Sequence, residues 1–290
     1  MQDAEASRQN NRAAGEDFAA AIADLPLISR VYFFPEIDST STWASWFLRR
    51  CGYSADLHGS VVLADYQTAG RGRYQRAWVS PPQRSLLFTL ILNANAFSAS
   101  NDHLSFATES RHIAQFLSLA APLSVCEGVQ EIAQIPARVK YPNDVLVRES
   151  KIAGILLENL GSEQEWFLIG IGVNVNQTRD ELPSSAECQA TSLFCETQRQ
   201  YERPRVLRAI LEKLCRWWEV GDLDSLTRRM NELCYTIGRL VKIVLPETEI
   251  MGVALGIAPG GALLVRDSAG RTREVYAGDI RELRFIEPKP

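Results

Sequence analysis

The chain has 290 residues and a mass of 32.4 kDa, and 46% of its residues are hydrophobic and 23% charged. At roughly 150 residues per domain, this length predicts about two domains. The composition excludes a mostly disordered chain, a collagen-like repeat and a small disulfide scaffold. The 31 Lys and Arg residues against 35 Asp and Glu residues give a net charge of −4, which disfavours a protein that coats nucleic acid. A local basic site is compatible with this balance.

The cysteines and histidines predict neither a zinc site nor a redox dithiol. The six cysteines include no Cys-x-x-Cys pair, and the three histidines form no His-Glu-x-x-His sequence. The N-terminus lacks the basic and apolar regions of a secretory signal, and the longest apolar run, Leu86–Leu92, is too short to span a bilayer. We therefore expect free thiols, no membrane association and a cytoplasmic location.

The N-terminal third is expected to begin with a polar tail over residues 1–30, in which a helix is possible from Glu16 to Leu25. After that the chain changes to short apolar runs separated by turn residues. Strands are expected at residues 60–64 and 85–92. The stretch between them, residues 67–82, is rich in Gly, Arg and Pro and is predicted to be a loop.

The middle of the chain predicts one helix and three strands. Helical spacing of apolar residues predicts a helix from Asp102 to about Leu119. Residues 138–146 and 151–157 are expected to form a hairpin that turns at residues 148–150, followed by a strand at residues 166–175.

The C-terminal part predicts two helices and then a small all-β unit. The helices are expected at residues 204–220 and 224–234. Four short strands are expected at residues 240–245, 250–257, 262–266 and 273–276. This arrangement is typical of an SH3-like barrel. The predicted organisation is a tail (residues 1–30), a main domain (31–235) and a barrel (236–290).

The sequence Gly70-Arg71-Gly72-Arg73, followed by Arg76 and Trp78, is the sharpest local feature. Two glycines let a backbone approach a ligand closely, and arginine side chains bind carboxylate or phosphate oxygens through two hydrogen bonds. For an arbitrary sequence of this kind, a solvated basic turn is the simpler interpretation. It is not a P-loop, because Gly-Lys-Ser/Thr is absent at the required spacing.

A second feature is Lys140-Tyr141-Pro142-Asn143-Asp144, followed by Lys151 and Gly154. Pro142 fixes the backbone at a strand kink, and an amide and a carboxylate follow it. Strand alternation predicts that Gly154, three residues after Lys151, lies on the opposite face and permits close approach of another group. On its own, this segment is more simply interpreted as a turn with a solvated lysine.

Two shorter pieces complete the set. Asp38-Ser39-Thr40 is typical of a helix N-cap. Gly170-Ile171-Gly172-Val173-Asn174 suggests a dinucleotide-binding loop, but position 175 is Val where the third glycine would stand, so the segment is predicted to be an apolar strand.

Together and in this order, these segments resemble the biotin–protein ligase family, as does the small C-terminal barrel. The resemblance covers about residues 31–285 and includes the spacing from Lys140 to Lys151. It implies an α+β fold, with a mixed sheet and flanking helices like those of class II aminoacyl-tRNA synthetases, plus an SH3-like barrel. It also implies a ligase that uses biotin, ATP and Mg²⁺, forms biotinyl-5′-AMP, and transfers biotin to a lysine of a biotin carboxyl carrier protein or domain.

The resemblance also implies residue roles. Lys151 would meet the biotin carboxylate and the α-phosphate, Asp144 would orient or deprotonate the acceptor lysine, and Arg73 would act in a loop that closes over both ligands. The implied biotin-binding residues are Ser39, Thr40, Ser41, Gln67, Gly70, Arg71, Gly72, Arg73, Lys151 and Gly154. The implied nucleotide-binding residues are Arg73, Arg76, Trp78, Asn143, Lys151 and Asn174. No residue is predicted to ligate a metal.

Three departures from the family pattern bear on these expectations. The family more often has Trp at the position of Tyr141. In the loop, Tyr74-Gln75 replaces a basic residue and a glycine. This second exchange affects loop closure and any homodimer that depends on the loop. About 30 N-terminal residues are too few for a winged helix, so we expect a monofunctional enzyme with no nucleic-acid partner. Two alternatives stay open: a lipoate or octanoyl ligase or transferase, and a non-catalytic biotin-binding protein.

Overall fold

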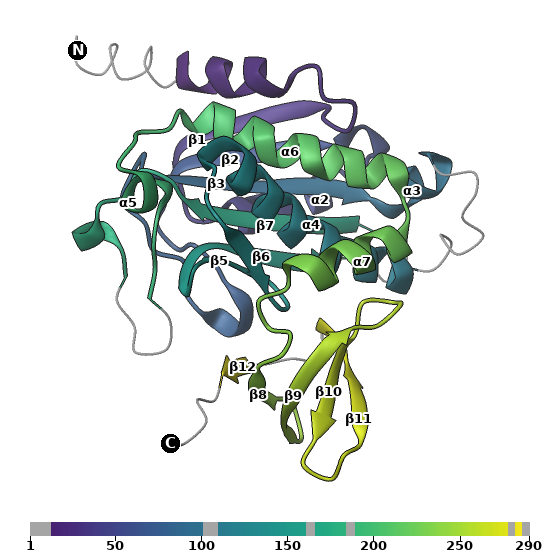
Figure 1. The fold of residues 1–290 in the computed structure, drawn as a ribbon. Helices are drawn as coiled ribbons and strands as arrows, with labels where there is room; N and C mark the ends of the chain where they lie inside the picture. Colours follow the sequence, from purple (N-terminus) through teal and green to yellow (C-terminus); the bar gives the residue numbers. More distant parts are fainter. Residues whose placement is uncertain (1–12, 101–109, 161–165, 184–188, 278–281, 286–290) are drawn as a thin grey trace.

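The computed structural model describes residues 13–100, 110–160, 166–183, 189–277 and 282–285. A seven-stranded sheet with helices on its faces forms the larger part, and a five-stranded sheet forms the C-terminal part (Figure 1). The predicted mixed sheet with flanking helices and a separate all-β unit is therefore confirmed.

The large sheet has the strand order β1-β2-β3-β7-β6-β5-β4. Its strands are β1 Arg30–Ile37, β2 Ser60–Gln67, β3 Ser85–Asn93, β4 Ala137–Lys140, β5 Asp144–Val147, β6 Ser150–Asn159 and β7 Trp166–Asn174. The first pair, β1 and β2, is parallel, and all other neighbours are antiparallel. The sheet is therefore mixed.

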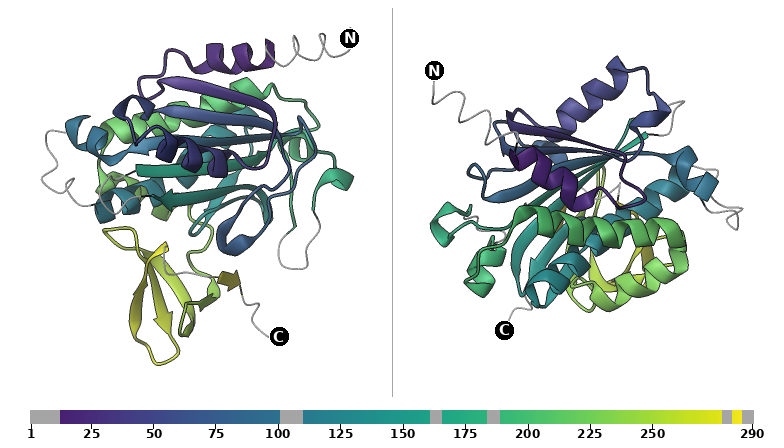
Figure 2. Two further views of the ribbon diagram at one scale, coloured as in Figure 1. Left: turned by 180° about the vertical axis from the view of Figure 1, so that it is seen from behind. Right: turned by 90° about the horizontal axis from the view of Figure 1, so that it is seen from above.

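Helices cover both faces of this sheet (Figure 2). They are α2 Thr40–Arg50, α3 Ala94–Ser100, α4 Ser110–Ala133, α5 Leu193–Thr197, α6 Arg203–Val220 and α7 Leu223–Leu233, with 3₁₀ turns η1 Ala55–Leu57, η2 Arg73–Gln75 and η3 Arg179–Glu181. Strand β3 shows why both faces are covered. Leu90 and Leu92 belong to the core that contains α4 and α6, whereas Ile91 packs with Ala44 and Leu48 of α2. Successive side chains point to opposite faces, so this predominantly apolar strand needs a helix on each side.

Helix α4 differs from its predicted bounds. We expected a helix from residue 102 to about 119. It runs from Ser110 to Ala133, and residues 101–109 lie outside the described part. Pro122 lies inside the helix, where a proline is unfavourable in isolation. The helix continues because its middle turns are buried against α6 and the sheet, and packing outweighs local propensity.

The predicted strand at residues 138–146 is in fact two strands. The chain turns at Tyr141-Pro142, and β4 and β5 pair with each other in a register that places Lys140 opposite Asp144. Proline has no N–H for a strand ladder, which explains the break. The turn at residues 148–150, between β5 and β6, is where we predicted it.

The N-terminal segment is not a polar tail over its described length. Residues 13–22 are helical, and the side chains of Phe18 and Ile22 are 2% and 0% exposed. Arg208 of α6 donates hydrogen bonds to the carboxylate of Asp24 at 2.6 and 2.9 Å. These bonds lower the pKa of Asp24 to about 2. The segment is therefore anchored to α6 and belongs to the main domain.

The C-terminal sheet has the strand order β11-β10-β9-β8-β12 and is entirely antiparallel. Its strands are β8 Leu240–Val244, β9 Glu249–Ile257, β10 Leu263–Asp267, β11 Thr272–Val275 and β12 Glu282–Phe285. The predicted turn at Gly260-Gly261 is present, with φ values of 99° and 85° that favour glycine. The buried hydroxyl of Tyr141 donates to the carbonyl oxygens of Gly261 and Val275, which ties this sheet to the β4–β5 turn.

Within the described residues, no helix combines the length and the apolar character needed to cross a membrane.

Candidate active site

A pocket of about 700 Å³ opens on the face of the large sheet that α2 covers. Along β7, Trp166 and Leu168 pack under α2, and the next two positions on this face are Gly170 and Gly172. Because glycine has no side chain, the sheet surface is bare there, next to the N-terminus of α2. A pocket of this size accommodates a cofactor-sized ligand.

The predicted site residues come from distant parts of the chain, and the structure brings almost all of them to this pocket. Those that line it are Ser39, Thr40, Ser41, Gln67, Arg71, Gly72, Arg73, Arg76, Trp78, Asn143, Asp144, Lys151, Gly154 and Asn174. Gly70 alone does not line it. It pairs with Trp78 at the base of the loop, where a Cβ would lie 2.4 Å from the Trp78 carbonyl oxygen.

A buried polar cluster forms the end of the pocket at the start of α2. Ser39 is the N-cap of this helix, as its sequence suggested. The backbone N–H and the hydroxyl of Thr40 donate to Gln67 Oε1 at 2.7 and 3.0 Å, so the Gln67 NH₂ group keeps its hydrogens for a ligand. Thr89 bonds to Thr40 and Ser41 from beneath. Thr89 was not predicted as a site residue, because it lies within a predominantly apolar strand.

The loop of residues 70–78 is an ordered hairpin. Trp78 N–H donates to the Gly70 carbonyl at 2.9 Å, and Gly72 N–H donates to the Arg76 carbonyl at 2.7 Å. At its tip Tyr74 has φ 52°, in the left-handed region, and is 49% exposed. The exchange of the family's basic residue and glycine for Tyr74-Gln75 is therefore compatible with a folded loop.

The indole of Trp78 lies on the bare part of the sheet. A Cβ on Gly172 would lie 2.6 Å from Trp78 Cε2, and one on Gly154 would lie 3.0 Å from Cζ3. A Cβ on Gly170 would lie 2.6 Å from the Ser41 hydroxyl. Real Cβ atoms essentially never approach other atoms below 3.0 Å. The Gly-x-Gly of β7 is therefore a flat floor for a tryptophan and a serine, and not a dinucleotide loop.

This packing predicts that Gly172→Ala displaces the indole and lowers the free energy of unfolding by about 1–3 kcal/mol, the usual cost of overpacking. Thermal unfolding measures the loss. In a Trp78→Leu background the same substitution should cost less than about 0.5 kcal/mol, because the clashing atoms are gone. An equal cost in both backgrounds would show that the contact with Trp78 is not the cause.

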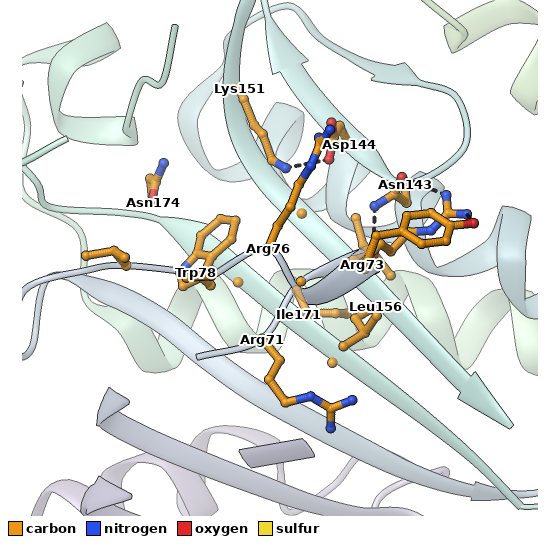
Figure 3. A pocket seen from close by; sticks show the side chains of 18 of the residues that line it. Arg71, Arg73, Arg76, Trp78, Asn143, Asp144, Lys151, Leu156, Ile171 and Asn174 are labelled. Carbon is orange, nitrogen blue, oxygen red and sulfur yellow. Dashed lines mark hydrogen bonds and ion pairs between the residues drawn. The ribbon is translucent and has the colours of Figure 1, made fainter. Parts of the chain in front are cut away.

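A charged pair stands over this floor. Lys151 Nζ lies 2.6 Å from Asp144 Oδ1 and 5.7 Å from the centre of the Trp78 ring, and Arg76 points toward Asp144 (Figure 3). A Cβ on Gly154 would lie 3.1 Å from Lys151 Nζ, so both residues face the pocket. Our expectation that they lie on opposite faces was wrong. The register of β5 and β6 shifts by one residue at Ile152, and this bulge reverses the alternation.

The two arginines of the Gly-Arg-Gly-Arg sequence have different partners. Arg71 points away from Lys151 and forms an ion pair with Glu158 at 2.6 Å (Figure 3). Arg73 donates to the Ala277 carbonyl at 2.8 Å and to Asn143 Oδ1 at 3.3 Å. Arg73 therefore connects the loop to the β4–β5 turn and to the C-terminal sheet, a contact that no local sequence pattern reveals.

Asn174 is 4% exposed and lies on the far side of Trp78 from Arg71 (Figure 3). Its Nδ2 donates to the Thr191 carbonyl at 3.0 Å, and its Oδ1 accepts from Gln177 Nε2 at 2.8 Å. Sequence reasoning missed both partners. The run of polar residues directly after the apolar strand β7 was the one signal that pointed to Gln177.

The described residues of the pocket include no cluster of metal-ligating side chains. Among the described residues, no group of three or more His, Cys, Asp or Glu side chains is placed to hold a metal ion. The two carboxylates near the pocket, Asp144 and Glu158, already pair with Lys151 and Arg71.

Known proteins are similar to this chain in sequence and in fold. A model of the "Biotin/lipoate A/B protein ligase family" matches residues 33–176, and a model of the "Biotin protein ligase C terminal domain" matches residues 236–281. The biotin--[acetyl-CoA-carboxylase] ligase of Mycobacterium tuberculosis is 31% identical over 241 residues, which cover 82% of this chain and 84% of that protein.

Two further comparisons agree. The bifunctional ligase/repressor BirA of Bacillus spizizenii is 31% identical over 77% of this chain, and the chain spans 66% of the length of BirA. The structure of the biotin protein ligase from Aquifex aeolicus in complex with biotin and ATP aligns with a TM-score of 0.71 and 29% identity, covering 89% of this chain and 100% of that chain. The chain therefore belongs to the biotin protein ligases of the biotin/lipoate A/B protein ligase family.

Proposed function

We propose that this protein is a biotin–protein ligase. It joins biotin to ATP, releasing pyrophosphate, and then transfers biotin from biotinyl-5′-AMP to a lysine of a biotin carboxyl carrier protein or domain. The observation that carries the proposal is the pocket lined by Lys151, Asp144 and Arg73 together with Gly170 and Gly172. Its support is the family membership, together with relatives that are named as biotin ligases and a similar structure that holds biotin and ATP.

In the first half-reaction two anions must meet. A biotin carboxylate oxygen attacks the α-phosphorus of ATP, and the bond from that phosphorus to pyrophosphate breaks as the new bond forms. Six cationic residues line the pocket: Arg71, Arg73, Arg76, Lys140, Lys151 and Arg284. Cations already in place offset the repulsion between the substrates and stabilise the charge that develops at the α-phosphate. We assign the contact with the reacting oxygens to Lys151.

Mg²⁺ completes this proposal. The described residues supply no cluster of carboxylates for it, and Mg²⁺ in nucleotide sites is commonly held by phosphate oxygens and water. When bound, it would further neutralise the triphosphate. The protein's own part is to bind the nucleotide that carries the ion.

The second half-reaction needs a neutral amine. A lysine side chain has a pKa near 10.4, so it reaches the reactive form at neutral pH only beside a base or with a lowered pKa. The amine nitrogen attacks the biotinyl carbonyl carbon, the bond to AMP breaks, and the amine loses a proton. Asp144 already holds an ammonium group, that of Lys151, at 2.6 Å. We assign to Asp144 the binding and deprotonation of the acceptor lysine.

Arg73 is proposed to retain the adenylate. Its side chain spans the loop, the β4–β5 turn and the C-terminal sheet through bonds to Asn143 and Ala277. Arg73→Ala is expected to accelerate release of biotinyl-5′-AMP by about 10–100-fold, the effect of losing one or two charge-assisted hydrogen bonds. Trapping of free adenylate by filtration measures the rate. The control is Arg205→Ala, whose side chain is 76% exposed and outside the pocket. Equal retention by Arg73→Ala and the parent would contradict the assignment.

The alternatives differ in what they predict. A lipoate or octanoyl ligase would activate those acids in preference to biotin, and a non-catalytic binding protein would hold biotin without releasing pyrophosphate. Pyrophosphate release measured side by side with biotin, lipoate and octanoate tests the proposed activity. Release that depends on biotin alone supports it, and preference for another acid contradicts it.

A cytoplasmic location is part of the proposal, since the five described cysteines, Cys51, Cys126, Cys195, Cys215 and Cys234, are all free thiols and the reaction uses ATP. Cys188 lies outside the described residues. A homodimer stays a prediction.

A further inference from the structure

Gln177 lies directly behind Asn174, between the start of β3 and the end of β7. Its side chain is 1% exposed, and it is surrounded by partners rather than by solvent. The Oε1 atom accepts from Val175 N–H at 2.8 Å. The Nε2 atom donates to Ser85 Oγ at 2.6 Å and to Asn174 Oδ1 at 2.8 Å. Every hydrogen of this amide group is therefore in use.

These contacts fix the orientation of two side-chain amides, first that of Gln177 and through it that of Asn174. A backbone N–H is always a donor, so the Gln177 atom that faces Val175 must be the oxygen. The NH₂ group of Gln177 then faces Asn174, and the Asn174 atom that meets it must also be an oxygen. The NH₂ group of Asn174 is left facing the Thr191 carbonyl at 3.0 Å. A flip of Asn174 would place two NH₂ groups against each other and two oxygens against each other.

The same residue also joins Asn174 to the strand that carries Lys151. The Gln177 carbonyl accepts from the Ser192 hydroxyl at 2.6 Å. Next to Ser192, Thr191 N–H donates to the Lys151 carbonyl at 2.8 Å, and Lys151 N–H donates to the Gln189 carbonyl at 2.7 Å. The segment that receives the Asn174 amide is thus held by Gln177 on one side and by β6 on the other.

We propose that Gln177 is a positioning residue for the nucleotide side of the pocket. It sets which atom of the Asn174 amide faces the pocket, and it holds one hydrogen of Nδ2 and one lone pair of Oδ1 in place for ATP. This inference rests on the proposed function, because it takes the ligand beside Asn174 to be a nucleotide. Gln177 does not line the pocket, so its effect passes through Asn174.

The test compares Gln177→Leu with Asn176→Leu. Asn176 is the neighbouring residue, and its side-chain amide also makes two hydrogen bonds to the backbone. Its Nδ2 donates to the Tyr201 carbonyl at 2.8 Å, and its Oδ1 accepts from Tyr201 N–H at 2.9 Å. Both substitutions remove hydrogen bonds from the same segment, but only Gln177 contacts Asn174. Thermal unfolding of both variants measures the structural cost. Gln177→Met, which keeps the length of the side chain, replaces the leucine variant if that variant does not fold.

Gln177→Leu is expected to raise the Kd of ATP, measured by calorimetry, and the KM of ATP by about tenfold, the effect of losing one well-placed hydrogen bond. The Kd of biotin should change less than about twofold, and Asn176→Leu should leave the Kd of ATP unchanged at a similar loss of stability. In an Asn174→Ala background, Gln177→Leu should add no further change.

The proposal is overturned if Gln177→Leu binds ATP as the parent does, or if both leucine variants weaken ATP binding equally. Failure of the proposed function gives a different result. In that case the parent releases no pyrophosphate from biotin and ATP, whereas the calorimetric comparison of ATP binding still decides the role of Gln177.

Discussion

Replacing Lys151 with methionine is expected to slow pyrophosphate release from biotin and ATP by about 10²–10³-fold, the usual effect of removing one preorganised charge at a reacting group. The ammonium group lies beside Gly154 and Trp78, 2.6 Å from Asp144. Methionine keeps most of the length of the side chain and removes its charge and its hydrogen-bond donors. Single-turnover kinetics with radiolabelled ATP measure the step.

A matched control is Lys242→Met. Lys242 pairs with Glu249 at 2.8 Å in the C-terminal sheet, so this substitution makes the same change in charge outside the pocket. It should leave the rate within about twofold, as expected for an exposed ion pair. An unchanged rate in the Lys151 variant would remove this lysine from the first half-reaction and with it the main electrostatic argument.

Replacing Asp144 with asparagine is expected to separate the two half-reactions. Adenylate formation should fall by less than about tenfold, because the amide oxygen still accepts a hydrogen bond from Lys151. Transfer of biotin from preformed biotinyl-5′-AMP to the carrier lysine should fall by about 10²–10⁴-fold, since an amide cannot accept the proton. Rapid-quench measurement of carrier labelling gives the transfer rate.

The transfer experiment has its own control and its own contrary outcome. Asp267→Asn neutralises a carboxylate that pairs with Arg271 and Arg273 at a turn of the C-terminal sheet, far from the pocket, and should transfer normally. If Asp144→Asn transfers at the parent rate, another group accepts the proton. If adenylate formation falls as much as transfer, Asp144 acts mainly by holding Lys151.

The sequence predicted the fold where local pattern decides it. Predominantly apolar runs identified β3 and β7, and Gly260-Gly261 identified a turn. Prediction from the sequence failed where contacts between residues far apart in the chain determine the structure. A helix was considered possible from Glu16 to Leu25 and is present at residues 13–22, but the burial of Phe18 and Ile22 in the main core was not predicted. Strand β12 pairs with β8 and was not predicted, since four residues carry too little periodicity.

The same distinction between local sequence pattern and distant contacts applies to the candidate active site. Almost every residue that the motifs named lines the pocket, because the resemblance rests on short segments. The position of Gly154 was wrong because a bulge at Ile152 depends on pairing with β5, and period-two alternation does not report it. Gln177 and Thr89 were missed because each acts through residues distant in the sequence or buried behind the site. Sequence segments identify the groups that line the pocket more readily than the groups that orient them.

The proposal that one pocket performs both half-reactions on biotin can be tested directly. Its most direct test is the intact mass of a biotin carrier domain after incubation with this protein, biotin, ATP and Mg²⁺. We expect that the carrier gains one biotinyl group, that the gain requires ATP, and that it disappears with Lys151→Met. A carrier of unchanged mass, with biotin bound tightly but no pyrophosphate released, would contradict the claim.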